Sequence, residues 1–171
     1  MNTARIRYAV ESDLPLILSW RNHPSIKKYM YTQHDITMQE HKEWFERCLS
    51  QPEDIHLLMF LVNEKSMGFI NFSHDKFDVV NWGFYISPDA PKGTGYALGL
   101  SAIEFGFKTL KFRKICGQVL SFNERSINFH KKLGFSQEGI FKEQFVNEKN
   151  YYDVYHFGLL KQIWAQRNDG N

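Results

Sequence analysis

Two periodicities of hydrophobic and polar positions alternate along the chain, and together they predict an order of strands and helices. Short apolar runs rich in β-branched and aromatic residues are bounded by turn residues and predict strands. These strands span 6–10, 56–62, 67–73, 79–87, 114–122, 139–146 and 151–160. Apolar residues at helical spacing predict helices over about 12–22, 37–49, 96–110 and 123–133. The order is β-α-α-β-β-β-α-β-α-β-β, with an antiparallel meander over 56–87.

Capping residues locate several of the helix ends. Ser12-Asp13-Leu14-Pro15 combines capping side chains with a proline in the first turn, and Pro24 ends that helix. Thr37 and Glu40 have the spacing of a capping box. Gly134 fits a left-handed cap after the last helix. Since no linker or repeat interrupts the pattern, we expect a single domain over 1–171 of the α+β class.

Composition excludes several classes of protein. The 171 residues are 43% hydrophobic and 23% charged, as in an ordinary globular domain, and the net charge of +2 argues against bulk nucleic-acid binding. The longest apolar run, 57–62, is far shorter than the roughly 20 residues that span a bilayer, so no membrane partner is expected. No signal peptide is apparent. With only two cysteines, Cys48 and Cys116, we expect a reducing, cytoplasmic location and no metal site.

The segment 82–97 is the most informative one for chemistry. A strand leads into a loop that contains Gly93-Thr94-Gly95, and a helix follows directly. Glycines allow positive φ and a close approach to a ligand, and the helix start offers N–H donors at its positive end. Lys92 adds a positive charge. These features predict a pyrophosphate site, whereas the alternative is a tight strand-to-helix connection; a Walker loop is excluded because no Gly-Lys-Ser/Thr follows.

A second segment, 123–135, contains another motif, and the two motifs together carry a family resemblance. With both segments, the sequence resembles the GNAT superfamily of acyl-CoA-dependent N-acetyltransferases over nearly the whole chain. The matching positions of the later motif are Asn123, Ser126, Phe129, Lys132, Gly134 and Phe135. Ala90 stands where the family has Arg or Gln, and His130 where it has Tyr. The resemblance implies a central, mixed, mostly antiparallel, twisted sheet flanked by helices.

The resemblance also implies acetyl-CoA as the acetyl donor, held by the loop and by the later helix. The strand before the loop would be splayed by a bulge so that its backbone pairs with the pantetheine, which Asn123 also bonds, unless Asn123 serves to hold the loop. The residues implied in cofactor binding are Tyr85, Ile86, Ser87, Lys92, Gly93, Thr94, Gly95, Tyr96, Ala97, Asn123, Ser126, Phe129 and Lys132.

Catalysis of acetyl transfer requires a neutral amine, a polarised thioester and a stabilised leaving thiolate. We hypothesise that His130, at the position of the family's general-acid Tyr, hydrogen-bonds the leaving sulfur; the alternative is a helix-surface His with the proton supplied by water. Glu124 is a candidate proton relay by position, or else an exposed carboxylate in a capping turn. Cys48 and Cys116 are expected in the core.

The acceptor is suggested by the run 20–41, with Arg-Asn-His-Pro at 21–24. This run resembles the acetyltransferases of pseudaminic acid biosynthesis, a pathway of flagellin glycosylation, which acetylate the 4-amino group of a UDP-linked amino sugar. The resemblance implies that Arg21 pairs with the diphosphate or uridine, as suits a bidentate guanidinium, and that His41 contacts the nucleotide. Tyr31 and Trp82 would cover sugar or base. The alternatives are a surface charge at Arg21 and a solvated His41.

Other functions stay open at this level. Arg-Asn-Asp/His-Pro also occurs in ribosomal-protein N-terminal acetyltransferases and polyamine acetyltransferases, and a non-catalytic acyl-CoA sensor is a further alternative. The resemblance also implies a homodimer, in which the C-terminal hairpin pairs with a second subunit. The aromatic fraction of 16% is interpreted as partly core and partly wall of the substrate cleft. Phe105, Phe107 and Phe112 are assigned to the core, and Trp20, Tyr31, Trp82 and Tyr85 to the cleft.

Overall fold

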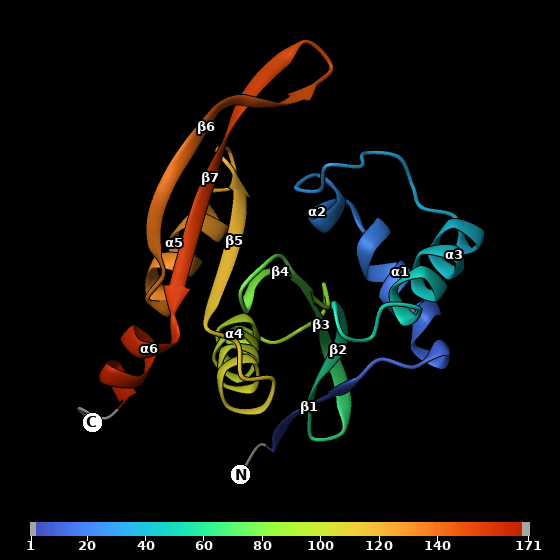
Figure 1. Ribbon diagram of the computed structural model, residues 1–171. Helices are drawn as coiled ribbons and strands as arrows, with labels where there is room; N and C mark the ends of the chain where they lie inside the picture. Colours follow the sequence, from blue (N-terminus) through green and yellow to red (C-terminus); the bar gives the residue numbers. More distant parts are fainter. Residues whose placement is uncertain (1–2, 169–171) are drawn as a thin grey trace. The chain divides into compact units, whose positions relative to one another are not determined.

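A computed structural model describes residues 3–168 of the chain (Figure 1). The strands are β1 (Ala4–Tyr8), β2 (Ile55–Val62), β3 (Lys65–His74), β4 (Val79–Ile86), β5 (Lys114–Leu120), β6 (Ser136–Asn147) and β7 (Asn150–Leu160). The helices are α1 (Leu14–Asn22), α2 (Pro24–Lys27), α3 (Met38–Leu49), α4 (Thr94–Glu104), α5 (Glu124–Leu133) and α6 (Lys161–Asn168), with a 3-10 turn η1 (Glu11–Asp13) and a π-helical turn η2 (Phe105–Thr109).

The strands are ordered β1-β2-β3-β4-β5-β7-β6 in a seven-stranded mixed sheet. The pairs β1–β2, β2–β3, β5–β7 and β6–β7 are antiparallel, and β4 pairs with β5 in parallel at Val79–Asn81. The chain divides into two compact units. The N-terminal unit holds the residues up to Ser73 together with Gly83–Ala102, and the C-terminal unit holds His74–Trp82 together with the residues from Ile103.

In the N-terminal unit, strand alternation sends side chains of β2 to two buried faces. Leu57, Met59 and Leu61 join Leu14, Ile17, Trp20, Phe45 and Cys48 of α1 and α3 in one core cluster. Figure 1 shows α1 and α3 on the same side of these strands. The opposite face is covered by α4, because a Cβ built on Gly68 of β3 would lie 2.4 Å from Leu98 Cδ1. Because both faces of the sheet are covered at β2, this strand is a nearly continuous run of apolar residues.

In the C-terminal unit, β5, β7 and β6 form an antiparallel set on which α5 packs. α5 begins at its N-cap Asn123, whose side chain accepts from Ser126 N–H, and ends at Gly134 with a φ of 95°. Its buried residues are Ile127, His130 and Leu133. His130 stacks on Phe157 of β7 with ring centroids 5.1 Å apart.

The predicted element order is confirmed, and the differences have local causes. α4 begins at Thr94, two residues before the predicted start, and the predicted helix over 96–110 changes to π-helical geometry at Phe105. α2 and α6 were not predicted, because α2 has only four residues and α6 lacks an amphipathic pattern. Residues 167–168 belong to α6, and 169–171 lie outside the described residues. Among 3–168, no helix is long and apolar enough to cross a membrane.

Candidate active site

The loop between β4 and α4 has the backbone conformation that its glycines predicted. Gly93 has a φ of +94°, and a Cβ at this position would meet open space, so the strain of a left-handed backbone is what favours glycine here. The N–H groups of Tyr96 and Ala97 donate to Gly93 O at 3.1 and 3.2 Å, and Thr94 N–H donates to Pro91 O at 3.2 Å. These three N–H groups are therefore engaged within the loop and the first turn, a point that the sequence did not reveal.

The strand that precedes this loop carries Tyr85, Ile86 and Ser87. Ser87 N–H donates to Met67 O of β3 at 2.9 Å, so the strand stays attached to its neighbour up to the loop. Burial raises the pKa of the Tyr85 phenol, and the positive charge of Arg21 partly offsets this rise. Tyr85 therefore stays protonated at neutral pH.

Arg21 and His41 form the second feature of the N-terminal unit. Arg21, near the end of α1, donates through Nη2 to Thr32 O at 3.0 Å. His41, on the first turn of α3, is only 4% exposed. Within residues 3–168, Arg21 Nη1 and His41 Nε2 are buried and have no hydrogen-bond partner. Leaving buried polar atoms unpaired costs about 1–3 kcal/mol each, and more for charged groups, so these nitrogens are candidates for bonds to a ligand, as is His156 Nε2 of the C-terminal unit.

The electrostatics of this pair are those of one cation beside a neutral donor or acceptor. Burial lowers the pKa of His41 most, and the Leu14 carbonyl partly offsets this effect, whereas the Arg21 charge lowers the pKa further. Burial also lowers the pKa of Arg21, although a guanidinium stays protonated at neutral pH. The site thus presents one fixed positive charge.

A chain of aromatic rings runs from His41 to Tyr85. His41 stacks on Trp44 with ring centroids 5.2 Å apart and planes 14° from parallel. Trp44 meets Phe69 edge to face at 6.1 Å, and Phe69 lies 5.2 Å from Tyr85. These rings supply apolar surface of the kind that lines small-molecule sites.

Tyr31 and Trp20, both expected at the substrate cleft, differ in their surroundings. Tyr31 is 55% exposed, whereas Trp20 is buried in the core cluster between α1 and β2. The assignment of Trp20 to the cleft is therefore wrong, because helical spacing turns it to the core face with Leu14 and Ile17. Tyr31 stays a prediction as a substrate residue.

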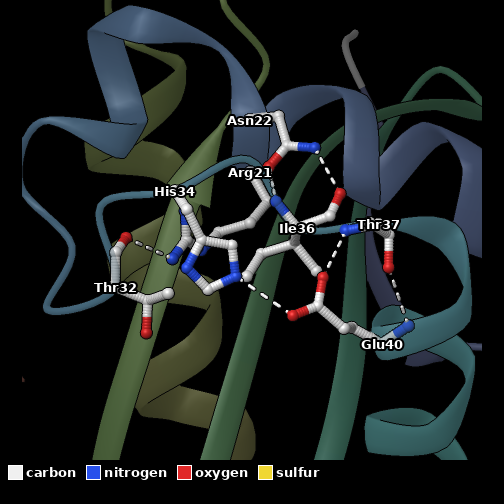
Figure 2. Close-up of polar contacts among 7 residues, drawn as sticks. All are labelled: Arg21, Asn22, Thr32, His34, Ile36, Thr37 and Glu40. Atoms are coloured by element: carbon white, nitrogen blue, oxygen red, sulfur yellow. Dashed lines mark hydrogen bonds and ion pairs between the residues drawn. The ribbon is translucent and has the colours of Figure 1, made fainter.

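The segment from Lys28 to Thr37 connects α2 to α3 and is attached to both α1 and α3 (Figure 2). Asn22 donates to Ile36 O and accepts from Ile36 N–H, both at 2.8 Å. Thr37 and Glu40 form the predicted capping box, with Thr37 N–H donating to Glu40 Oε2 at 2.7 Å. These bonds, with help from His34, lower the pKa of Glu40 to about 2.

In the C-terminal unit, His130 is buried with both ring nitrogens engaged. It is 2% exposed, its Nε2 accepts from Trp82 Nε1–H at 3.1 Å, and its Nδ1 donates to Ser126 O at 2.8 Å. Burial lowers its pKa to about 4, although the Ser126 carbonyl partly opposes this shift. A neutral ring in this tautomer has no N–H left for a leaving thiolate, so these contacts favour a structural role over the hypothesised acid.

Trp82 has the same character, although it was predicted to cover a substrate. It is 7% exposed, and its indole stacks on Phe135 with centroids 5.2 Å apart. A Cβ on Gly117 would come within 2.6 Å of His130 Nε2 and 2.8 Å of Trp82 Nε1, so glycine is required for this hydrogen bond. These contacts make Trp82 a core residue of the C-terminal unit, because one indole face and its N–H are already occupied.

The remaining predicted residues of the C-terminal unit lie along α5. Asn123 uses its side-chain oxygen as the cap, accepting from Ser126 N–H at 3.2 Å. Glu124 is exposed in the first turn, which is the setting of a capping-turn carboxylate. Phe129 is half-buried and Lys132 is exposed. Their roles toward the cofactor stay predictions.

The cysteines and other possible metal ligands form no centre. Cys48 is buried and Cys116 half-buried, and burial raises the pKa of both thiols. In the described part of the chain, no three His, Cys, Asp or Glu side chains gather as metal ligands.

Sequence reasoning missed Asn22 and Trp44. Asn22 follows Arg21 directly within the quoted Arg-Asn-His-Pro run, and Trp44 lies one helical turn after His41. The helical spacing i, i+3 was the available signal for the stack of Trp44 on His41. Nothing local indicated that Asn22 would bond to a residue fourteen positions away.

Comparison with known proteins identifies a match over most of the chain. The profile of the acetyltransferase (GNAT) domain family matches residues 4–136. Acetyltransferase PseH from two strains of Campylobacter jejuni is 26% and 29% identical, over 83% of this chain and 84% of the relative. The SPbeta prophage-derived uncharacterized N-acetyltransferase YokL from Bacillus subtilis is 30% identical over 71% of this chain and 70% of the relative.

Among solved structures, spermidine N-acetyltransferase from Vibrio cholerae, in complex with CoA and spermine, has the same fold. It superimposes with a TM-score of 0.86, covers 95% of this chain and 98% of its own, and is 20% identical in sequence.

Proposed function

From the premise that this chain belongs to the acetyltransferase (GNAT) domain family, we propose its acceptor: the 4-amino group of a UDP-linked amino-dideoxy sugar, as in the pseudaminic acid pathway. Family membership makes the protein an acetyltransferase, and acetyl-CoA is the donor that such enzymes use. The similarity to Acetyltransferase PseH supports the choice of acceptor class.

The observation that carries this proposal is the buried, unpaired pair of nitrogens on Arg21 and His41. A guanidinium nitrogen without a partner gains most from an anionic oxygen, and diphosphate oxygens suit its donor geometry. His41 is neutral and its other ring nitrogen faces the Leu14 carbonyl, so its open Nε2 can accept a hydrogen bond from a ribose hydroxyl or from the uracil N–H. The apolar rings of Trp44 and Phe69 extend the site away from the charge.

The donor side rests on the loop before α4. The positive φ of Gly93 and the start of the eleven-residue helix α4 fit a pyrophosphate, which N–H groups of 93–97 would bind. Those of Thr94, Tyr96 and Ala97 would exchange their present bonds for it. Lys92, which is exposed, would add charge. The backbone of Tyr85, Ile86 and Ser87 would bond the pantetheine. In the C-terminal unit, Asn123, Ser126, Phe129 and Lys132 are proposed as further cofactor residues.

The reaction is a direct attack by the acceptor amine. The lone pair of the neutral amine forms an N–C bond with the thioester carbonyl carbon, the C–S bond breaks, and CoA leaves as the thiolate. The amine proton passes to water, with Glu124 proposed as a relay. Since His130 is engaged at both nitrogens, the thiolate takes its proton from solvent in this account.

A polyamine acceptor is the second candidate, because spermidine N-acetyltransferase shares the fold. A polycation would need carboxylates at the site. In the N-terminal unit, Arg21 repels a polycation, and Asp13 is engaged by a bidentate contact from Arg7 at 2.6 and 2.8 Å. Glu40 is committed to its capping box and to His34. The charge of the site therefore favours an anionic acceptor over a polyamine or a basic protein N-terminus.

An acceptor panel tests the proposal. CoA release is measured with acetyl-CoA and three amines: a UDP-linked 4-amino-dideoxy sugar, the same amino sugar without its nucleotide, and spermidine. We expect the UDP-linked sugar to have a kcat/KM at least about 100-fold above the other two, the ratio that one strong charged contact supplies. A preference for spermidine, or equal use of both sugars, would overturn the proposal. A homodimer stays a prediction that sedimentation would test.

A further inference from the structure

We propose that Asn22 is a positioning residue for the acceptor site, because it fastens the segment 28–37 to the end of α1. We call this segment the strap. This inference rests on the proposed function insofar as the strap orients the Arg21 guanidinium. The contact of Asn22 with the strap is itself independent of any acceptor (Figure 2).

Asn22 forms two hydrogen bonds with the strap, one as donor and one as acceptor. Its Nδ2 donates to Ile36 O and its Oδ1 accepts from Ile36 N–H, each at 2.8 Å. A single amide side chain thus satisfies both backbone groups of Ile36, as a neighbouring strand would do in part of a ladder. The contact is partly shielded from water, since Asn22 and Ile36 are both half-buried.

Arg21 contacts the same strap four residues earlier. Its Nη2 donates to Thr32 O at 3.0 Å, and this bond fixes one edge of the planar guanidinium. Because the group is rigid, fixing Nη2 also fixes the direction of Nη1, the buried nitrogen that has no partner among the described residues. Where Thr32 O lies therefore determines where Nη1 can bind a ligand.

Only part of the strap is held by strong contacts other than Asn22. Its last residue, Thr37, caps α3 through the exchange of hydrogen bonds with Glu40. Lys27 forms an ion pair with Asp35 at 2.6 Å, but the Asp35 side chain is 69% exposed, and such pairs contribute little. Asn22 and Arg21 thus both attach the strap to α1 by hydrogen bonds to its backbone, and of the two only Asn22 bonds both the N–H and the C=O of one residue.

These contacts couple the Asn22 side chain to the position of the Arg21 guanidinium. Asn22 holds Ile36, the strap between Ile36 and Thr32 holds the Thr32 carbonyl, and that carbonyl holds Arg21. Loss of Asn22 would let the strap move and free the guanidinium to rotate. Acceptor binding would weaken, whereas acetyl-CoA binding, which the loop 93–97 is proposed to provide, would not change.

Three variants separate this role from general stability. Asn22→Ala removes both bonds, and Asn22→Gln keeps the amide on a longer stem. Asn63→Gly is the control, since it removes another side-chain bond to backbone in the same unit, Thr3 N–H to Asn63 Oδ1 at 3.0 Å, at a position whose φ of 49° suits glycine. The readouts are amide hydrogen exchange without ligand and the separate KM values for acceptor and acetyl-CoA.

For Asn22→Ala we expect exchange over 32–37 to accelerate about 10-fold or more and the acceptor KM to rise about 10-fold, with kcat and the acetyl-CoA KM changed less than about 2-fold. Asn22→Gln should recover part of the acceptor affinity, and Asn63→Gly should leave both readouts at wild-type values.

Unchanged exchange over 32–37 in Asn22→Ala overturns the fastening role whatever the acceptor is. Accelerated exchange with an unchanged acceptor KM overturns the positioning role. Failure of the wild type to use the UDP-linked sugar overturns the proposed function, while the exchange result still decides whether Asn22 fastens the strap.

Discussion

His41 in the N-terminal unit and His130 in the C-terminal unit are both helix residues, both nearly inaccessible, and both kept neutral by burial. They differ in what their nitrogens do. His130 accepts from Trp82 and donates to Ser126, whereas His41 Nε2 is buried without a partner in the described part of the chain. The imidazole with a complete set of bonds holds a core together, and the imidazole with an open nitrogen, in the unit that also holds the open guanidinium, is the one that we propose for ligand binding.

This difference argues against a hypothesis drawn from sequence position alone. Motif alignment pointed to His130 as the chemical residue, because it replaces a family Tyr. Burial alone would have made the two histidines equal. The hydrogen bonds of the individual ring nitrogens distinguish the two histidines. A buried polar atom without a hydrogen bond costs free energy, and most buried polar atoms in protein cores have a partner.

Replacing His130 by Ala should have the largest effect on stability. The change opens a cavity and leaves Trp82 Nε1–H without its acceptor, so we expect the free energy of unfolding to fall by about 3 kcal/mol. Urea denaturation measures this loss, and the kcat of the folded variant should stay within about 3-fold of wild type. A kcat reduced by more than about 100-fold in folded protein would reinstate His130 as the leaving-group acid.

Replacing Arg21 by Ala should have the largest effect on acceptor use. Removal of a charged donor from a buried phosphate contact is expected to lower kcat/KM for the UDP-linked sugar about 100-fold, equal to about 2.7 kcal/mol. Steady-state kinetics with saturating acetyl-CoA measure the change. Arg5→Ala is the matched control, because Arg5 pairs with Glu64 on the surface of the same unit. Equal effects of both variants would refute a specific contact.

Acid should destabilise the C-terminal unit through His130. Its pKa is about 4 when folded and about 6.5 in an unfolded chain, so between these values the unfolded state binds more protons and stability falls as the pH falls. The contribution lost between pH 7.5 and pH 5 is about 2 kcal/mol. Denaturation at the two pH values should show this loss in wild type and a loss smaller by about that amount in His130→Ala. Identical pH dependence in both proteins would exclude the burial of a neutral His130.

Replacing His41 by Phe should have the smallest effect. The ring keeps its stack on Trp44 but loses the open Nε2, so we expect kcat/KM for the UDP-linked sugar to fall about 10-fold and the free energy of unfolding to change by less than about 1 kcal/mol. Steady-state kinetics with saturating acetyl-CoA measure the first change, and urea denaturation measures the second. A loss of stability as large as that of His130→Ala would make the two histidines equivalent.

Much of the fold was readable from local patterns. The capping box at Thr37, the cap at Gly134 and the apolar runs of β2 and β3 depend on residues close in sequence, and the structure confirms each. The start of α4 was misplaced because Gly95 disfavours a helix locally, yet it lies in the first turn.

The candidate site was only partly predictable. Arg21 and His41 were identified through resemblance, but that both retain an open buried nitrogen depends on packing. Whether His130 is a surface or a core residue depended on β5, where Gly117 leaves the space in which its ring meets Trp82. Contacts of this kind join residues that are distant in sequence, so the local hydrophobic pattern cannot predict them.

We propose above that Arg21 and His41 bind the nucleotide of the acceptor. Calorimetric titration of wild type, Arg21→Ala and His41→Phe with UDP tests it most directly. We expect UDP to bind the wild type, with an affinity about 100-fold weaker in Arg21→Ala and about 10-fold weaker in His41→Phe. Equal UDP affinity in all three proteins, or wild-type protein that binds spermidine and not UDP, would contradict it.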